Sequence, residues 1–448
     1  MVVKWGITDC CNLNCKHCYY TTLKKQTYGL DIRDMKCLVD KLFSAGVDCI
    51  QLLGGEPFNY DAITELIDYI KYKGINLWVN TNFQNLSEKT LYQIKNCAFD
   101  RFIISLDGAD EESNDTNRGD GTFLKIIDNL NKLKNICTVN NNIYINSILN
   151  KLGVTRMHFF YSFIKKYDYI KNISISLPDI TGNALSQSTD FFSNVNDYLD
   201  NVFAFLEKII IDNIYQKFTF GVSPFIESYI YDKHKIENVF NKNYCMGGCS
   251  VYYLDPDAFL YPCNLEYGIN YFKKINNCDN NLLKHSFDEI IKCIPFNNFY
   301  ADVRLIEKNC IDKKTICNKC SFRMNNICQI KCPLDKKEPI YRKMCEYFLS
   351  KNKILDSKFE IITKKLTKKI VKNGKINIFK LIPGSRWVTY ENSIEFYSRK
   401  FNKNYLISYD NVDQIIKILE NENELNSGNV ETKLLQMLKS IGIIEYAS

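Results

Sequence analysis

The sequence predicts an α/β protein that begins with a partial (β/α)6 TIM barrel and continues into a loop-rich, cysteine-rich segment and a small α+β unit. Three observations predict this class. Strand-length and helix-length segments alternate over the first half of the chain, the 19 cysteines gather mainly in two groups, and strand-like patterns return near the C-terminus. A chain of 448 residues with 46% hydrophobic residues is long enough for several domains.

The barrel is predicted from six apolar segments of strand length: residues 2–8, 48–54, 75–80, 100–106, 142–148 and 173–177. Amphipathic segments of helix length lie between them, for example residues 33–46, 60–74 and 121–135, and each ends near a Gly or Asn. This alternation continues to about residue 215 and predicts a parallel sheet with helices outside. We therefore assign residues 1–225 to the barrel and expect its chemistry at the carboxyl ends of the strands.

Three cysteines directly follow the first predicted strand. Cys11, Cys15 and Cys18 form a CxxxCxxC pattern in a single loop. No signal peptide or membrane-length apolar segment is apparent, so we expect a soluble, cytoplasmic protein in which metal coordination explains the cysteines better than disulfides. A closed zinc site would need a fourth ligand, such as Cys10 or His17. The spacing instead favours a four-iron cluster with one iron left open for a small molecule.

Polar motifs also follow the next three predicted strands. The second is followed by Gly54, Gly55, Glu56 and Pro57, where a backbone without side chains and a carboxylate suit an ammonium group. The third is followed by Asn80-Thr81-Asn82, and the fourth by Ser105-Leu106-Asp107-Gly108, whose small polar groups suit ribose hydroxyls. Each motif alone is equally explained by a turn or a helix cap.

Taken together in this order, these motifs resemble the radical S-adenosylmethionine (SAM) superfamily over roughly the first half of the chain. The resemblance implies that SAM chelates the open iron and that reduction yields a 5′-deoxyadenosyl radical, which abstracts hydrogen. It implies that Cys11, Cys15 and Cys18 bind the cluster. The SAM-binding residues that it implies are His17, Gly54, Gly55, Glu56, Asn82, Ser105, Asp107 and Arg118. Taken alone, His17 could equally be surface filler, and Arg118 would be a solvated loop charge.

The second cysteine group contains eight thiols: Cys245, Cys249, Cys263, Cys317, Cys320, Cys328, Cys332 and Cys345. Eight thiols could coordinate two four-iron clusters completely, and a pair of zinc knuckles is the alternative. The array resembles the SPASM extension of peptide-modifying radical SAM enzymes, with Ala258 in place of a glycine. By that resemblance, one auxiliary cluster takes Cys245, Cys249, Cys263 and Cys332, and the other takes Cys317, Cys320, Cys328 and Cys345. We assign residues 226–350 to this domain.

The residue after Cys263 separates two branches of that family. Sulfatase-maturing members carry an aspartate there as a general base, whereas this chain has Asn264, which cannot accept that proton. Formylglycine formation is therefore a minor alternative unless another carboxylate, such as Glu266, replaces the aspartate. The eight cysteines outside both groups are expected to be small buried side chains: Cys10, Cys37, Cys49, Cys97, Cys137, Cys278, Cys293 and Cys310.

The C-terminal part begins with a Lys-rich amphipathic connector, residues 351–374. In residues 375–448, four strand-like segments precede two helix-like segments and a final apolar strand. This order resembles the small winged-helix, PqqD-like domain with which many peptide maturases bind a leader peptide, by adding a leader strand to a sheet edge. A packing, dimerisation or DNA-binding module is the alternative.

These observations lead to one functional hypothesis: a radical SAM/SPASM enzyme that crosslinks a ribosomally made precursor peptide, with a cysteine thioether as the first choice. Other carbon–carbon or carbon–oxygen crosslinks remain open, as does a non-catalytic iron–sulfur or zinc scaffold. The resemblance implies three [4Fe–4S] clusters, SAM, and an electron donor such as flavodoxin or ferredoxin. The net charge of +7 is spread along the chain, so we expect neither a nucleic-acid nor a membrane partner. The catalytic base is not identified.

Overall fold

The computed structural model describes the first half of the chain almost completely and the second half in part. The described residues are 1–22, 28–96, 98–135, 142–176, 178, 182–187, 195–220, 234, 247–248, 250–265, 269–270, 279–293, 296, 299, 379–381, 386–390, 393–398, 403–408, 440 and 444–446. Of the second cysteine group, only Cys263 lies within these ranges. The other seven cysteines of that group and the predicted connector lie outside them, and so do the two C-terminal helix-like segments apart from Ser440.

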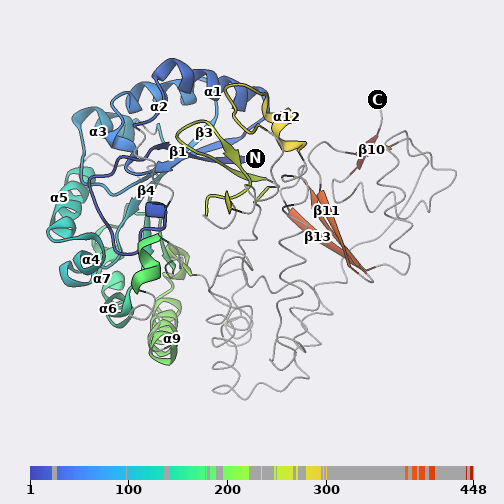
Figure 1. The fold of residues 1–448 in the computed structure, drawn as a ribbon. Helices are drawn as coiled ribbons and strands as arrows, with labels where there is room; N and C mark the ends of the chain where they lie inside the picture. The colour runs from blue at the N-terminus through green and yellow to red at the C-terminus, as the bar shows by residue number, and fades with distance from the viewer. Residues whose placement is uncertain are drawn as a thin grey trace.

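A curved, nine-stranded sheet forms the centre of the described structure (Figure 1). Its order is β7-β6-β5-β4-β3-β2-β1-β8-β9, and all neighbours pair in parallel except β8 and β9. The strands are β1 (Val2–Thr8), β2 (Cys49–Gly54), β3 (Asn76–Thr81), β4 (Arg101–Ser105), β5 (Ile143–Ile148), β6 (Asn172–Ser176), β7 (Phe218–Phe220), β8 (Val251–Leu254) and β9 (Leu260–Tyr261).

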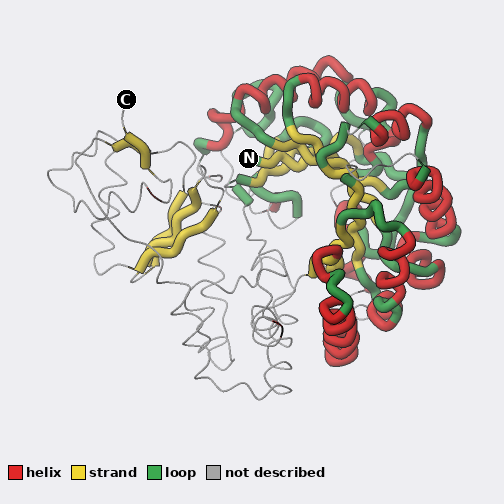
Figure 2. Tube along the Cα trace, turned by 180° about the vertical axis from the view of Figure 1, so that it is seen from behind, coloured by secondary structure: helices red, strands yellow, loops and turns green. Residues whose placement is uncertain are grey.

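Helices form a layer outside this curved sheet, while the strands line its inner side (Figure 2). The α-helices are α1 (Ile32–Ser44), α2 (Ile63–Tyr72), α3 (Glu88–Lys95), α4 (Glu111–Arg118), α5 (Thr122–Lys134), α6 (Lys151–Thr155), α7 (Phe159–Lys166), α9 (Val195–Ile211) and α12 (Phe287–Ile291). Short 3-10 helices are η1 (Tyr19–Thr22), η2 (Pro57–Asn59), η3 (Gly182–Gln187) and η4 (Tyr215–Lys217).

The core lies between the outer face of the sheet and the helices. Alternate strand residues such as Val3, Trp5 and Ile7 are completely buried there, in one cluster with apolar residues of α1. Side chain caps define the helix starts: Asp31 accepts hydrogen bonds from two backbone N–H groups at the start of α1. The other strand residues point to the inner, concave side, where most are only half buried.

The six predicted strands are confirmed within one or two residues, and so is the α/β barrel-like class. The prediction missed β7, β8 and β9, because segments of two to four residues carry too little periodicity. In the C-terminal part, β11 (Arg386–Tyr390), β12 (Ser393–Ser398) and β13 (Lys403–Ser408) form an antiparallel sheet, while β10 (Phe379–Leu381) pairs with β14 (Ile444–Tyr446). These strands agree with the prediction; the winged-helix class stays a prediction.

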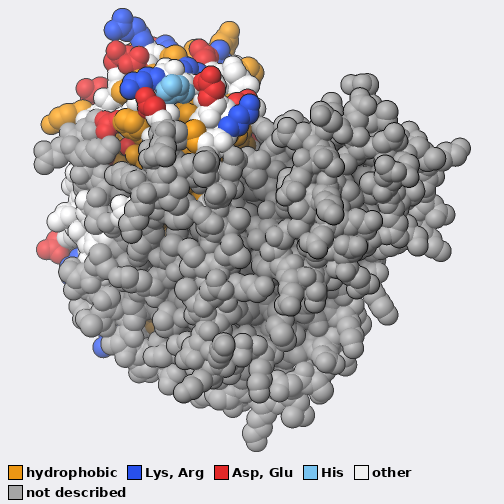
Figure 3. Space-filling model, turned by 45° about the vertical axis from the view of Figure 1, so that its right-hand side comes forward, with side chains coloured by type: hydrophobic (Ala, Val, Ile, Leu, Met, Phe, Trp, Pro, Cys, Tyr) orange, Lys and Arg blue, Asp and Glu red, His pale blue; other side chains and the backbone are white. Residues whose placement is uncertain are grey.

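On the face shown in Figure 3, positive, negative and apolar side chains are intermingled over the described surface, without a band of one charge. Within the described ranges, no helix has the length and apolar character required to cross a membrane. Four of the eight cysteines that were expected to be buried lie in the described ranges, and only Cys49 is buried. Cys10 and Cys293 are half buried, and Cys37 is exposed because it lies on the outer side of α1.

Candidate functional site

The loop that carries Cys11, Cys15 and Cys18 follows β1 at the carboxyl edge of the sheet. Its backbone is anchored to neighbouring elements: the N–H of Lys16 donates to the carbonyl of Asn117 in α4 at 2.8 Å. The loop then turns into η1. Because parallel strands end at the same edge, this loop faces the segments that follow β2, β3 and β4.

The three thiols lie close enough to influence one another. Burial is the main cause that raises the pKa of Cys15 to about 11, and the nearby Cys18 and Cys11 add to it, while Arg118 opposes it. A buried thiolate therefore needs a neighbouring cation, which a metal cluster supplies. Within the described ranges, no three His, Cys, Asp or Glu side chains approach closely enough to hold a single metal ion. Three thiols in one loop fit the donor set of an iron–sulfur cluster.

The turn of η3 holds this loop from the other side. The side-chain amide of Asn183 donates to the carbonyl of Cys15 at 2.9 Å, and its backbone N–H lies 3.0 Å from the carbonyl of Cys18. Gly182 has a φ of +60°, and a Cβ at this position would lie 2.3 Å from the carbonyl oxygen of Cys18. Only glycine allows this approach, so Gly182 and Asn183 position the cysteine loop.

Glu56 is buried beside the loop, with an exposed fraction of 2%. Its carboxylate accepts hydrogen bonds from the hydroxyl of Thr81 at 2.8 Å and from the backbone N–H of Asn82 at 2.6 Å. Burial raises its pKa to about 7, although these hydrogen bonds act in the opposite direction. The carboxylate therefore sits where a ligand ammonium would stabilise its charged form.

The backbone of Gly55 and Glu56 packs closely against the backbone of the cysteine loop. The N–H of Glu56 donates to the carbonyl of Cys10 at 2.8 Å, and a Cβ on Gly55 would lie 2.2 Å from the same oxygen. Asn82 completes the connection: its amide donates to the side chain of Asn12 at 2.7 Å and lies 3.9 Å from the sulfur of Cys11. The GGEP segment and Asn82 are thus packed directly on the loop.

Asp107 and Arg118 form a buried ion pair below the loop. Asp107 is fully buried and Arg118 is 7% exposed, and the guanidinium contacts both carboxylate oxygens at 2.9 and 3.0 Å. His17 also faces this carboxylate, with Nδ1 at 3.4 Å from Oδ2. Arg118 is therefore not a solvated loop charge, and the His17 side chain, 11% exposed, is not surface filler.

Ser105 ends β4 on the inner face, half buried and in register with Asn146 of β5. The structure thus brings the predicted residues His17, Gly54, Gly55, Glu56, Asn82, Ser105, Asp107 and Arg118 to the same edge of the sheet as the three thiols. Their contacts with SAM stay predictions.

The first part of the predicted auxiliary domain packs against this site. Asn264, next to Cys263, accepts a hydrogen bond from Lys4 at 3.1 Å, and its amide lies 3.5 Å from the hydroxyl of Tyr19, the neighbour of Cys18. The buried hydroxyls of Tyr253 and Tyr20 also meet at 3.3 Å. Position 264 therefore lies beside the cysteine loop. Glu266, the alternative carboxylate, lies outside the described residues.

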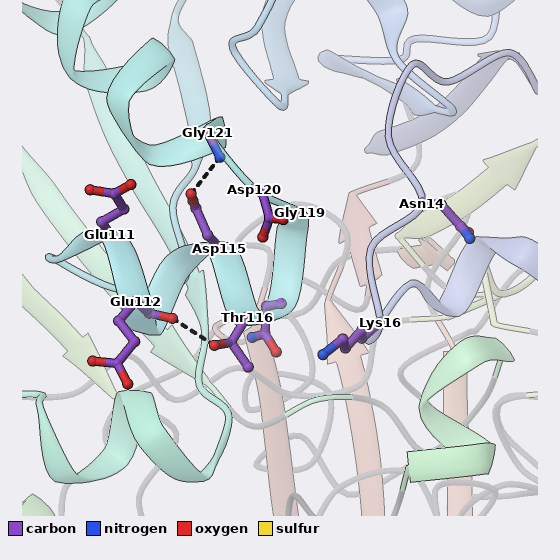
Figure 4. Close-up of a pocket in the computed structure, with 10 residues that line it drawn as sticks. Asn14, Lys16, Glu111, Glu112, Asp115, Thr116, Gly119, Asp120 and Gly121 are labelled. Carbon is purple, nitrogen blue, oxygen red and sulfur yellow. Dashed lines mark hydrogen bonds between the residues drawn. The ribbon is translucent and has the colours of Figure 1, made fainter.

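A cavity of about 730 Å³ opens between the cysteine loop and the corner of α4 and α5 (Figure 4). The loop contributes Asn14 and Lys16, and the Lys16 side chain extends toward α4. Four carboxylates on the other side make the cavity acidic: Glu111, Glu112, Asp115 and Asp120. The carboxylate of Asp115 already accepts hydrogen bonds from the backbone N–H groups of Gly121 and Phe123.

Sequence reasoning missed three positioning residues of the site: Gly182, Asn183 and Asn117. A Gly-Asn pair shortly after the sixth strand was the available signal for the first two. The cysteine loop that they contact lies far earlier in the chain: Asn183 and Cys15 are separated by 168 residues. No local pattern identifies such a contact.

Residues 5–150 match the family model of the radical SAM superfamily. This part of the chain, which includes the three thiols and the segments after β2, β3 and β4, is a radical SAM domain. The family implies one [4Fe–4S] cluster and SAM at this edge of the sheet, and the arrangement of the donor thiols fits that group.

Sequence relatives share this domain. The chain is 30% identical over 131 residues to the mycofactocin maturase MftC of Mycolicibacterium smegmatis. This alignment covers 29% of this chain and 33% of the relative. The chain is also 34% identical over 119 residues to the Fe-coproporphyrin III synthase of Methanosarcina barkeri, and this alignment covers 26% of this chain and 30% of the relative. The similarity thus spans about a third of the length of these relatives.

Solved structures share the fold over a larger part of the chain. SuiB of Streptococcus suis bound to its precursor peptide SuiA superimposes with a TM-score of 0.54 at 16% identity, covering 72% of this chain and 70% of SuiB. The protein anSMEcpe with bound AdoMet and the Kp18Cys peptide superimposes with a TM-score of 0.55 at 16% identity, covering 81% of this chain and 99% of that chain. These likenesses show that the chain shares its fold with both proteins over most of its length.

Proposed function

We propose that the chain is a radical SAM/SPASM enzyme that modifies a ribosomally made precursor peptide by hydrogen abstraction and oxidative crosslinking. The main structural support is that three loop thiols and the buried carboxylate of Glu56 lie together at one edge of the sheet. The peptide substrate is supported by relatives named as maturases and by the shared fold with SuiB, which was solved with a precursor peptide.

When bound, a reduced cluster and SAM supply a 5′-deoxyadenosyl radical at this edge. The chain's own residues hold and orient the reactants. Glu56 takes the amino group of SAM, since an ammonium offsets the cost of burying its charge. The Asp107–Arg118 pair fixes the segment after β4, and Ser105 faces the same space from the inner side. Gly182 and Asn183 keep the thiols in position.

Crosslinking sets a requirement on the rest of the protein. Closing a thioether removes two hydrogens from the peptide: one leaves in 5′-deoxyadenosine, and the other leaves as a proton and an electron. An electron acceptor must therefore lie near the peptide. We propose the second cysteine group for that role, with two further [4Fe–4S] clusters. Its support within the described residues is the contact of Asn264, the neighbour of Cys263, with Tyr19 beside the cysteine loop.

A cysteine thioether is the product that we propose first, and other peptide crosslinks are its alternatives. Formylglycine chemistry is disfavoured, because Asn264 uses its oxygen to accept from Lys4 and cannot act as a base. The C-terminal unit is proposed to bind the leader of the precursor, and flavodoxin or ferredoxin is proposed as the electron donor.

Deuterium transfer tests the reaction. A precursor peptide labelled at the modified carbon should pass its label into 5′-deoxyadenosine in the anaerobically reconstituted full chain. The protein should also hold about twelve irons if three four-iron clusters form. Absence of transfer from every labelled position refutes hydrogen abstraction, and zinc without iron supports the non-catalytic scaffold instead.

A further inference from the structure

The strands of the nine-stranded sheet carry few charged residues. Strands β1 to β9 contain only two charged residues, Lys4 in β1 and Arg101 in β4, and both are positive. They lie in one row, because Lys4 pairs with Gln51, Gln51 with Trp78, and Trp78 with Arg101. Side chains in register on parallel strands share a face. This row is opposite to the face that is buried under the helices.

Arg101 is held in a defined orientation. Its guanidinium lies 4.3 Å from the ring centroid of Trp78 and 5.1 Å from that of Tyr144. The residue is exposed, and among the described residues its guanidinium has no hydrogen bond or ion pair. The nearest acidic residue in sequence, Asp100, is already occupied by Lys71 and by the N–H of Leu77. These ring contacts use none of the N–H donors of the guanidinium, so the donors stay available for a carboxylate.

We propose that Arg101, stacked between Trp78 and Tyr144, binds a carboxylate side chain of the peptide substrate on the inner face of the barrel. This inference deepens the proposed function and rests on it for the identity of the ligand as a peptide. A peptide is the occupant that we choose because the row faces the concave side, below the edge where the reaction takes place. Lys4, engaged by Asn264, adds positive potential in the same row.

The position of Arg101 also predicts a spacing. Arg101 is the first and Ser105 the last of the five residues of β4. This strand therefore spans about 13 Å, and an extended peptide covers that distance in about four residues. We expect an Asp or Glu about four residues from the residue that reacts.

Binding of matched peptides tests the site without turnover. The probes are short fluorescent peptides of uncharged, polar background that contain one cysteine and one glutamate, and the same peptides with glutamine. We expect the reconstituted full-length protein with SAM to bind the glutamate peptide about threefold more tightly, the usual size for an exposed ion pair. Arg101→Gln should abolish this preference, and Arg101→Lys should reduce it, because lysine lacks the planar donors. Arg33→Gln, which changes an exposed arginine on α1, should retain it.

The outcomes separate this inference from the proposed function. Equal binding of both peptides, no binding of either, or a glutamate preference that survives in Arg101→Gln overturns the site. Free glutamate that displaces the peptide at the same concentration assigns the site to a small carboxylate and overturns the peptide ligand. If the preference depends on Arg101 but no peptide is ever modified, the proposed reaction fails while the site stands. If peptides are modified but glutamate and glutamine peptides bind equally well, the Arg101 site fails while the proposed reaction stands.

Discussion

The contact between Gly182 and the cysteine loop gives the sharpest structural prediction. Gly182→Ala places a Cβ 2.3 Å from the carbonyl oxygen of Cys18 and 2.8 Å from the hydroxyl of Thr21. Ordinary contact requires the two segments to separate by about 1 Å, which a packed site does not absorb without moving the loop. A left-handed residue with a side chain costs a further 1–2 kcal/mol or so.

The matched control is Gly74→Ala. Gly74 has a φ of +75°, like Gly182, but a Cβ there meets nothing within 4 Å. Both substitutions therefore carry the backbone cost, and only one displaces the cysteine loop. We expect both variants to fold, with a lower thermal unfolding midpoint for Gly182→Ala, because it carries the steric clash as well as the backbone cost.

The assay is iron content and SAM cleavage after anaerobic reconstitution with dithionite. Gly182→Ala should hold less iron per chain than the control and cleave SAM about 100-fold more slowly, since displacements of about 1 Å have such effects on reactive geometry. Equal iron content and equal cleavage in the two variants would refute the assignment of Gly182 as a positioning residue of the loop.

Three other predictions concern two buried carboxylates and one half-buried lysine. Because burial raises the pKa of Glu56 to about 7 from 4.5, the folded state binds its proton more tightly than the unfolded state, so stability from this group is complete below pH 4.5 and is lost as the pH rises to 7. In denaturant titrations, the free energy of unfolding of Glu56→Gln should rise by about 3 kcal/mol relative to that of the natural chain as the pH increases from 4.5 to 7. A difference between the two proteins that does not change with pH would contradict the raised pKa. Asp107→Asn should lower the free energy of unfolding by about 3 kcal/mol, because it leaves a buried guanidinium without its carboxylate. Asp31→Asn should leave it nearly unchanged, because Asp31 is an exposed helix cap and asparagine caps a helix equally well; equal losses in the two variants would count against the buried pair. Lys41→Met should cost about 2 kcal/mol, since the ammonium donates to three carbonyl oxygens of the loop before α12, and Lys36→Met, which loses one surface pair, should cost under about 1 kcal/mol in the same titration.

Much of the barrel could be predicted because its signals are local. The segment VVKWGIT alternates only weakly, yet its apolar character and its position before the cysteine loop identified β1 correctly. The thiols of Cys11, Cys15 and Cys18 and the carboxylate of Glu56 were found because short motifs place them immediately after strands. Residues that directly follow parallel strands meet at one edge of the sheet, so these side chains could be placed together from the sequence.

Other features depend on distant contacts and could not be predicted. The buried position of Arg118 follows from its partner Asp107, and an arginine in a polar loop gives no sign of it. Asn183 reaches the loop from the far end of the sheet. The stacking of Arg101 depends on the register of three strands, which an apolar pattern does not specify to the residue.

The most direct test of the account is the formation of 5′-deoxyadenosine by Cys15→Ala beside Cys37→Ala, measured after anaerobic reconstitution with SAM and dithionite. Cys37 is exposed on the outer helix α1, so its variant controls for the loss of one thiol. The account predicts native production by Cys37→Ala and none above background by Cys15→Ala. Native production by Cys15→Ala would contradict it.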